Sequence, residues 1–147
     1  MSAPITVVAA VIEQSGLILI CQRRRGDQFE LKWEFPGGKV KPGETLQEAL
    51  LRELSEELQV SAAIGPELFR TRHRYAEMDY EIELVFFAAT LGLETMMNRA
   101  FERVVWAERT RLSTYDFLPA DRELVERLSK AKAKIQDSIP KPLDEKR

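Results

Sequence analysis

Three glutamates, Glu53, Glu56 and Glu57, stand close together in a segment with a helical apolar period. On a helix turning about 100° per residue, their side chains fall within an arc of about 100°. This arc borders the stripe that contains Leu50 and Leu54, whereas a merely solvated acidic face belongs opposite it. Like charges beside apolar residues repel, and a bound cation relieves that repulsion. The pattern suits a Mg²⁺ site, but glutamate-rich helices are common, so taken without its context it favours a plain acidic surface.

The residues around these glutamates strengthen the metal hypothesis. Gly37–Gly38 permits close approach of the backbone, and its carbonyl oxygens could join the shell of a metal. Glu44 lies near the predicted start of the helix, where a carboxylate interacts well with the positive end of the helix dipole. Arg52 can pair with Glu48 or Glu56 at four-residue spacing, and such a pair would orient a ligand.

The elements that must position these residues follow from the apolar pattern and the turn residues. The predicted strands are 5–12, 17–22, 33–36, 68–75, 80–90 and 103–106, and the predicted helices are 44–59 and about 120–134. We expect Gly37–Gly38 to form a glycine turn, residues 23–32 to form a loop, and Gly65-Pro66 to end the segment after the first helix. This order of strands and helices predicts a mixed sheet covered by helices.

The length and composition indicate one soluble globular domain. The chain has 147 residues, of which 44% are hydrophobic and 31% charged, and we assign the domain to residues 1–135. Residues 136–147 contain two prolines and a charged end, which predicts a disordered tail.

The charge balance and the single cysteine exclude several classes of protein. Lys and Arg number 22 against 24 Asp and Glu, and a net charge of −2 disfavours stable binding to duplex nucleic acid. The one cysteine, Cys21, cannot form an intrachain disulfide. The start of the chain does not resemble a signal peptide, and no apolar run approaches the roughly 18 residues of a membrane span. We therefore expect a cytoplasmic protein without a membrane segment.

One segment resembles a known family motif. From Gly38 to Val60 the chain reads GKVKPGETLQEALLRELSEELQV. This stretch resembles the Nudix box, in which a glycine, five residues, a glutamate and seven residues precede Arg-Glu-apolar-x-Glu-Glu-x-Gly-apolar. The matching positions are Gly38, Glu44, Arg52, Glu53, Leu54, Glu56, Glu57 and Val60. Gln59 replaces the last glycine of the pattern, which bears on the end of the helix more than on the chemistry.

The resemblance implies an α/β (α+β) fold, namely a Nudix-type α/β/α sandwich with a mixed sheet between helices. It also implies hydrolysis of a nucleoside diphosphate linked to another group. By this resemblance Glu53, Glu56 and Glu57, with a carbonyl of Gly37 or Gly38, hold Mg²⁺ or Mn²⁺. Glu53 would be the general base.

The flanks of the box are similar to MutT-like members of the family, which remove oxidised guanine triphosphates. Residues 33–39 resemble the segment before the box in those proteins, and residues 117–121 resemble their Phe-Pro-Pro-Ala-Asn segment. Glu102 matches a further metal-ligating position of these members. The substrate-binding residues implied are Arg23, Glu34, Phe35, Lys39 and Asp121. Asp121 stands where MutT-like members have a base-reading asparagine, and an ionised carboxylate can only accept hydrogen bonds.

These features favour a pyrophosphohydrolase that converts an oxidised purine triphosphate, such as 8-oxo-dGTP, to the monophosphate and pyrophosphate. Removal of pyrophosphate from RNA 5′ ends, or hydrolysis of a pyrimidine triphosphate of the CTP or dCTP type, is an alternative. A non-catalytic nucleotide-binding module is a remote alternative, because all three glutamates are present. The sequence leaves a monomer and a homodimer equally open.

Overall fold

The computed structural model describes residues 4–77 and 79–131 of the chain. The strands are β1 (Ile5–Gln14), β2 (Leu17–Gln22), β3 (Trp33–Glu34), β4 (Gly37–Lys39), β5 (Ala62–Arg74), β6 (Glu81–Leu91) and β7 (Arg103–Glu108). The helices are α1 (Leu46–Leu58), α2 (Arg122–Lys130) and two short 3-10 helices, η1 (Arg109–Thr114) and η2 (Pro119–Asp121). The tail predicted for residues 136–147 lies outside the described residues.

The central strand of the sheet is β1. It runs parallel to β6 and antiparallel to β2 and β4, while β5 extends the sheet beyond β6 and β7 pairs with β2. Residues 8–12 of β1 are all buried. An uninterrupted apolar run of this kind is typical of a strand that is covered on both faces. The sheet is therefore mixed and has a protein layer on each side.

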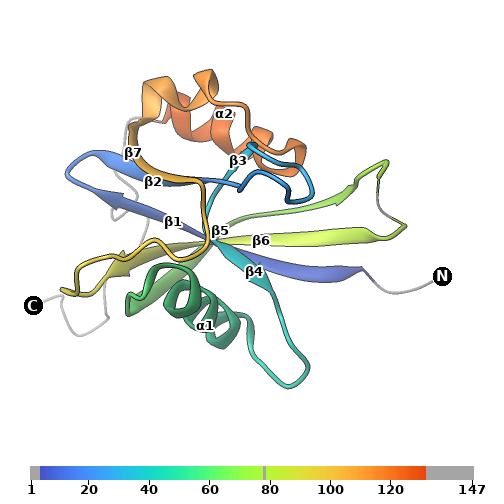
Figure 1. Ribbon diagram of the computed structural model, residues 1–147, viewed down its shortest axis with the longest axis horizontal. Coiled ribbons are helices and arrows are strands. Elements are labelled where there is room, and N and C mark those ends of the chain that lie inside the picture. The colour runs from blue at the N-terminus through green and yellow to red at the C-terminus, as the bar shows by residue number, and fades with distance from the viewer. Residues whose placement is uncertain (1–3, 78, 132–147) are drawn as a thin grey trace, which may run out of the picture.

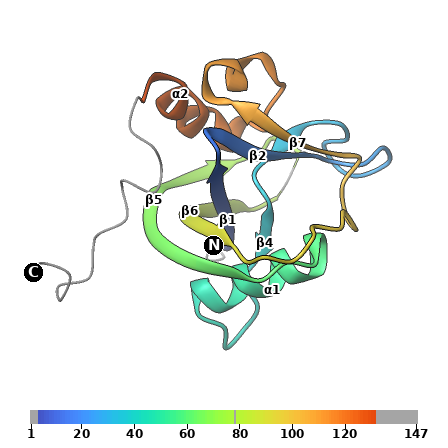
Figure 2. The same ribbon diagram turned by 90° about the vertical axis from the view of Figure 1, so that its left-hand side faces the viewer.

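Two helical layers enclose the sheet. Figures 1 and 2 show α1 on one face, and α2 with the 3-10 helices on the other. The core beside α1 includes Val8, Ala10, Ile12, Leu50, Leu54 and Leu58. The core on the opposite face includes Ala9, Val11, Phe86, Leu124 and Leu128. Successive residues of β1 thus pack into opposite cores, as the two-residue period of a strand requires. The predicted α/β/α sandwich is confirmed.

The helix α1 begins and ends at definable caps. Its N-cap is Thr45, whose hydroxyl accepts from the backbone N–H of Glu48 at 3.0 Å. The Glu48 carboxylate in turn accepts from the backbone N–H of Thr45 at 2.9 Å, which completes a capping box. The helix therefore starts after Thr45 and not at Glu44 as predicted. At the other end Gln59 adopts a left-handed conformation, with φ 54°, although it lacks the freedom of glycine.

The predictions for two glycine-containing segments are wrong. Gly37–Gly38 does not form a turn, because it belongs to β4, which pairs with residues 7–9 of β1. A side chain at Gly37 would collide with the backbone of Val8, so the pairing is possible only for glycine. Gly65-Pro66 does not end the preceding segment either. β5 continues through it with shifts in register, which an edge strand tolerates because the missing N–H of proline faces no partner strand.

The second predicted helix, 120–134, is shorter than expected within the described residues. Pro119 opens the 3-10 turn η2, and α2 follows from Arg122. Asp121 precedes α2, yet its side chain makes no capping hydrogen bond to that helix. Its carboxyl is therefore available for contacts other than helix capping. Residues 132–134 lie outside the described part of the chain. No described helix is long and apolar enough to cross a membrane.

Candidate active site

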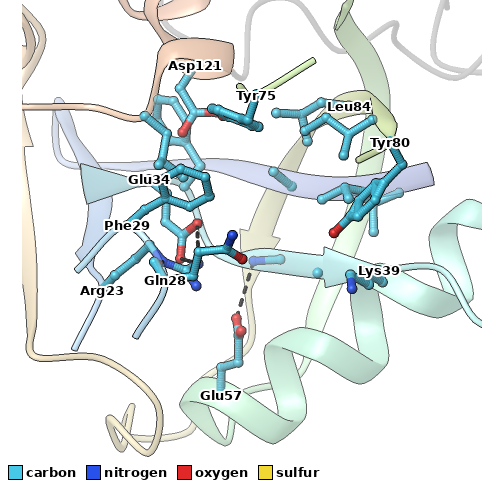
Figure 3. Close-up of a pocket in the computed structure, with 18 residues that line it drawn as sticks. Arg23, Gln28, Phe29, Glu34, Lys39, Glu57, Tyr75, Tyr80, Leu84 and Asp121 are labelled. Atoms are coloured by element: carbon cyan, nitrogen blue, oxygen red, sulfur yellow. Dashed lines mark hydrogen bonds and ion pairs between the residues drawn. The ribbon is translucent and has the colours of Figure 1, made fainter. Parts of the chain in front are cut away.

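A pocket of about 280 Å³ lies between β4, the 23–32 loop, the end of β5 and η2, with Glu57 of α1 reaching it (Figure 3). All the residues predicted to bind substrate line this pocket, namely Arg23, Glu34, Phe35, Lys39 and Asp121. Gly37, Gly38 and Glu57, predicted to hold metal, line it as well. The fold thus gathers into one cavity residues that stand up to about a hundred positions apart in the sequence.

The metal-binding candidates lie where α1 passes beneath β4. The backbone N–H of Gly37 donates to Glu57 Oε1 at 3.2 Å. The Glu53 carboxylate lies so close to Gly38 that an added Cβ there would overlap it. Because a glycine at position 38 leaves room for this carboxylate, α1 and β4 can approach closely. The expected close approach of the backbone at these glycines therefore occurs.

Arg52 holds the glutamates of this region in place. Its Nε and Nη2 donate to the two carboxylate oxygens of Glu44 at 2.6 and 2.9 Å. Its Nη1 donates to Glu53 at 3.0 Å and to Glu56 at 3.2 Å, and Nη2 also donates to the carbonyl of Lys39. These bonds from Arg52 lower the pKa of Glu44 to about 2. Of the two partners considered for Arg52, the structure selects Glu56, since Glu48 serves in the capping box.

Burial disfavours the ionised form of two of these glutamates, Glu53 and Glu57. Desolvation, followed by the nearby charges of Glu53 and Glu34, raises the pKa of Glu57 to about 9. Desolvation also raises the pKa of Glu53, although the hydrogen bond from Arg52 opposes it. A divalent cation would stabilise both carboxylates in the ionised form.

The donor set fits a hard cation. Glu53, Glu56 and Glu57 offer carboxylate oxygens, and the backbone of Gly37 and Gly38 offers carbonyl oxygens, which are the ligands Mg²⁺ prefers. Within the described ranges, no three Asp, Glu, His or Cys side chains already stand as a complete metal cage. In the present arrangement the first two glutamates bind Arg52 and the third binds the N–H of Gly37.

The family resemblance implies a further metal ligand, Glu102, which directly precedes β7. Its side chain is exposed before β7, and its Oε1 accepts from the backbone N–H of Arg25 at 3.4 Å. Like Glu53 and Glu56, Glu102 does not line the pocket. Its role as a metal ligand stays a prediction.

The other end of the pocket contains a buried carboxyl group, that of Asp121, and a half-buried one, that of Glu34. Asp121 is only 3% exposed, and its Oδ2 is a buried polar atom without a hydrogen-bond partner in the described residues. Desolvation raises the pKa of Asp121 well above its ordinary range, and the charge of Glu34 adds to the rise. Desolvation also raises the pKa of Glu34 to about 7, against the opposing effect of Arg23. A ligand that donates hydrogen bonds would supply the missing partner of Asp121 Oδ2 at this end of the pocket.

Arg23 and Lys39 occupy different parts of the pocket wall. Arg23 Nε donates to the carbonyl of Gln28 at 2.8 Å, and its Nη1 contacts the two Glu34 oxygens at 3.3 and 3.4 Å. Lys39 is exposed, with Nζ 5.9 Å from the centre of the Tyr80 ring. Two cations therefore lie along the pocket, one inside it and one at its rim.

Aromatic residues form much of the remaining wall, and sequence reasoning missed most of them. Phe35 was considered, and its ring packs against Phe117, with centroids 5.4 Å apart. Phe29 and Tyr75 were not considered, yet their rings meet at 4.8 Å at the pocket. A weak signal existed, because Phe29 is the one aromatic residue in the charged 23–32 segment. Nothing in the sequence indicated that it would meet Tyr75.

Comparisons with known proteins show which proteins this chain is similar to. A family model described as NUDIX domain matches residues 3–128. CTP pyrophosphohydrolase from Escherichia coli (strain K12) is 37% identical over 83% of this chain and 89% of that protein. The 8-oxo-dGTP diphosphatase from Haemophilus influenzae is 34% identical over 84% of this chain and 90% of that protein. The crystal structure of MutT protein from Methanosarcina mazei Go1 has a TM-score of 0.77 at 21% identity, covering 88% of this chain and 96% of that one.

The chain belongs to the Nudix family. The family prediction made from the box is confirmed, and the fold likeness to MutT confirms the architecture. The protein is a hydrolase of phosphoric anhydrides, in the group of nucleoside triphosphate pyrophosphohydrolases. Nudix hydrolases generally use a divalent metal such as Mg²⁺ and act on small nucleotides.

Proposed function

We propose that this protein hydrolyses an oxidised purine nucleoside triphosphate, such as 8-oxo-dGTP, to the monophosphate and pyrophosphate, with Mg²⁺ as cofactor. The observation that carries the proposal is the composition of the pocket. Glu57 of the Nudix box lines one end, and the other end contains the buried carboxyl of Asp121, whose Oδ2 has no hydrogen-bond partner among the described residues. A triphosphate fits the first end, and a base rich in N–H donors fits the second.

The proposed chemistry divides among the residues of the first end. Glu53, Glu56 and Glu57, with a carbonyl of Gly37 or Gly38, would hold Mg²⁺ or Mn²⁺. The bound cation supplies neutralisation of phosphate charge and a lower pKa for the attacking water. The Glu53 carboxylate would take the proton of that water as it attacks a phosphorus of the anhydride between the α- and β-phosphates. The P–O bond of that anhydride breaks, and the monophosphate and pyrophosphate are released.

Other residues would position the reacting groups. Arg52 fixes the Glu53 carboxylate through the hydrogen bond of 3.0 Å. Arg23 and Lys39 line the pocket and are proposed to contact phosphate oxygens. Because Arg23 also binds Glu34, its contact with phosphate would come from a guanidinium that the pocket already holds in position.

The proposed base preference rests on Asp121. Hydrogen bonds donated by a bound base would favour the ionised form of Asp121, whose oxygens accept, and the guanine ring offers N–H groups on its ring and on its exocyclic amine. Oxidation at C8 adds a further N–H at N7, so 8-oxoguanine presents more donors than guanine does. Glu34 and Phe35 line the same end of the pocket and are proposed to contact the base.

A second candidate substrate is CTP or dCTP. The relative from Escherichia coli that shares 37% identity is named CTP pyrophosphohydrolase. The exocyclic amino group of cytosine would also donate to Asp121. Cytosine offers fewer donors than 8-oxoguanine, which is the reason for ranking it second.

The proposal is tested by steady-state turnover with Mg²⁺ on 8-oxo-dGTP, dGTP, CTP, dCTP and a 5′-triphosphate RNA. We expect the highest kcat/KM for 8-oxo-dGTP. A clear lead for CTP or dCTP would support the second candidate, and a lead for the RNA would support neither. The Glu53→Gln variant checks that the activity belongs to this site, because it should lose turnover on every substrate.

The proposed cellular role is removal of damaged nucleotides from the pool that feeds DNA synthesis, in the cytoplasm. A strain lacking the protein should then show a raised frequency of A·T to C·G transversions, which pairing of 8-oxoguanine with adenine produces. An unchanged mutation spectrum would argue against this role. The protein remains a proposed monomer or homodimer.

A further inference from the structure

A hydroxyl group lies beside the base-reading carboxyl. Tyr75 and Asp121 are neighbours at one end of the pocket (Figure 3). The backbone N–H of Ala120, the residue before Asp121, donates to the Tyr75 hydroxyl at 3.2 Å. The hydroxyl oxygen is therefore an acceptor in this contact, and its own proton is left for another group. No described residue is found to accept that proton, and Asp121 Oδ2 does not.

We propose that Tyr75 is a specificity-determining residue whose hydroxyl donates a hydrogen bond to the base. The acceptor on the base would lie next to the N–H group that donates a hydrogen bond to Asp121. The inference rests on the proposed function, since it assumes that the base lies at this end of the pocket. An asparagine at position 121 would combine a donor and an acceptor in one amide. Here the carboxylate supplies the acceptor and the phenol supplies the donor.

The tyrosine is held firmly enough to read a base. Its side chain is 6% exposed, and its ring packs against Phe29 at 4.8 Å and His73 at 4.3 Å between centroids. The Ala120 contact ties the hydroxyl to the same backbone that carries Asp121. Donor and acceptor therefore keep a fixed separation, which discriminating hydrogen bonds require.

This donor–acceptor pair distinguishes two oxidised purines. In 8-oxoguanine, the N7–H donor lies next to the O6 acceptor, so both protein groups find a partner. In 8-oxoadenine, N7–H is present but the group at C6 is an amine, which leaves the Tyr75 proton facing another donor. An unmatched polar group in a closed site costs binding, so we expect the pair to favour 8-oxo-dGTP over 8-oxo-dATP about tenfold.

The Tyr75→Phe variant tests the proposal because it removes the hydroxyl and keeps the ring. We expect kcat/KM for 8-oxo-dGTP to fall about tenfold, with little change for 8-oxo-dATP. The ratio between the two substrates should then approach one. No change on either substrate, or an equal fall on both, would overturn the proposal, since an equal fall assigns the hydroxyl to the Ala120 contact alone.

A rescue experiment separates base reading from a structural effect of the hydroxyl. Adding Asp121→Asn to Tyr75→Phe places a donor and an acceptor back at the base. The double variant should regain kcat/KM for 8-oxo-dGTP relative to Tyr75→Phe, whereas a loss caused by the Ala120 contact would persist. Absence of rescue in a double variant with the melting temperature of Tyr75→Phe would therefore overturn the inference.

Failure of the proposed function would be recognised separately. If the wild-type enzyme prefers CTP to 8-oxo-dGTP, the proposed substrate is wrong, and Tyr75 is then tested on CTP and UTP. Cytosine has an amine at C4 and an acceptor at N3, whereas uracil has a carbonyl at C4 and an N–H donor at N3. A changed CTP/UTP ratio in Tyr75→Phe supports the reading role of the hydroxyl, and an unchanged ratio overturns it.

Discussion

The two ends of the pocket are built in opposite ways. At the end proposed to bind phosphate (the phosphate end), Glu53, Glu56 and Glu57 all lie on α1, and the glycines of β4 precede them by at most twenty residues. At the base end, Phe29, Glu34, Tyr75 and Asp121 come from four segments spread over more than ninety residues. A local motif defines the first end, whereas long-range packing assembles the second.

This difference suggests how function is divided in the molecule. Chemistry common to many substrates needs a fixed set of ligands, and one helix with one adjacent strand supplies it. Discrimination among bases needs groups that approach from several sides, so it depends on loops and strand ends. Changes at the phosphate end should therefore affect all substrates alike, and changes at the base end should alter their ranking.

The largest expected effect is at Glu53. Replacing it with Gln removes the proposed general base, and kcat should fall by about 10²–10⁴-fold on every substrate. The matched control is Glu48→Gln on the same helix, because glutamine also completes a capping box and activity should be retained. Steady-state assays of both variants on each substrate measure the loss of kcat. A loss confined to one base would contradict the division between the two ends.

A smaller but still uniform loss is expected from Gly38→Ala. The added Cβ would overlap the Glu53 carboxylate and displace it, so kcat should fall on the order of 100-fold. Gly43→Ala is the control, since position 43 has open space but a left-handed φ of 84°. That control should lose thermal stability and keep its activity. Retained activity in Gly38→Ala would show that Glu53 need not occupy its present position.

The Asp121→Asn variant should change the ranking of substrates and not abolish turnover. We expect the kcat/KM ratio of 8-oxo-dGTP to CTP to change about tenfold, because an amide donor replaces a carboxylate acceptor. The same panel of substrates measures the ratio. An equal change on all substrates would place Asp121 outside base recognition.

Asp121 also predicts a dependence of stability on pH. Burial raises its pKa well above the ordinary value, so above about pH 4 the folded state holds a proton that the unfolded state releases. The unfolded state then binds fewer protons, and the contribution of Asp121 to stability falls as pH rises until its folded pKa is passed. The melting temperature of Asp121→Asn should therefore exceed that of the wild type by a margin that grows with pH. A margin independent of pH would contradict this assignment.

The smallest expected effect is at Gln59, where the chain departs from the family motif. Its left-handed conformation costs a non-glycine residue more than glycine, so Gln59→Gly should raise the free energy of unfolding by roughly 0.5–1 kcal/mol. Thermal denaturation measures the gain, and kcat/KM should stay unchanged. Altered turnover would mean that this motif position serves chemistry as well as folding.

Much of the phosphate end could be predicted because its information is local. The spacing of Glu53, Glu56 and Glu57 fixes them on one side of a helix whatever the rest of the chain does. The box also identified the family and, through it, the sandwich architecture. The metal-binding and catalytic roles of these residues stay predictions, as does the domain boundary at residue 135.

The errors of prediction share a physical cause. Gly37–Gly38 was expected to turn, and it forms a strand because β1 offers its backbone for pairing. Gly65-Pro66 was expected to break the chain, and β5 continues because its edge position does not need every backbone N–H. In each case the place of the segment in the sheet, which the local sequence does not encode, overrode the local preference.

The sequence by itself determined the class of reaction, because a motif on one helix carries its own geometry. Only the tertiary structure decided the base end. Tyr75 reaches Ala120 across forty-five positions, and Phe29 meets Tyr75 because the 23–32 loop folds over the pocket. Such contacts depend on how strands and loops pack around two cores, and no local spacing of residues encodes them.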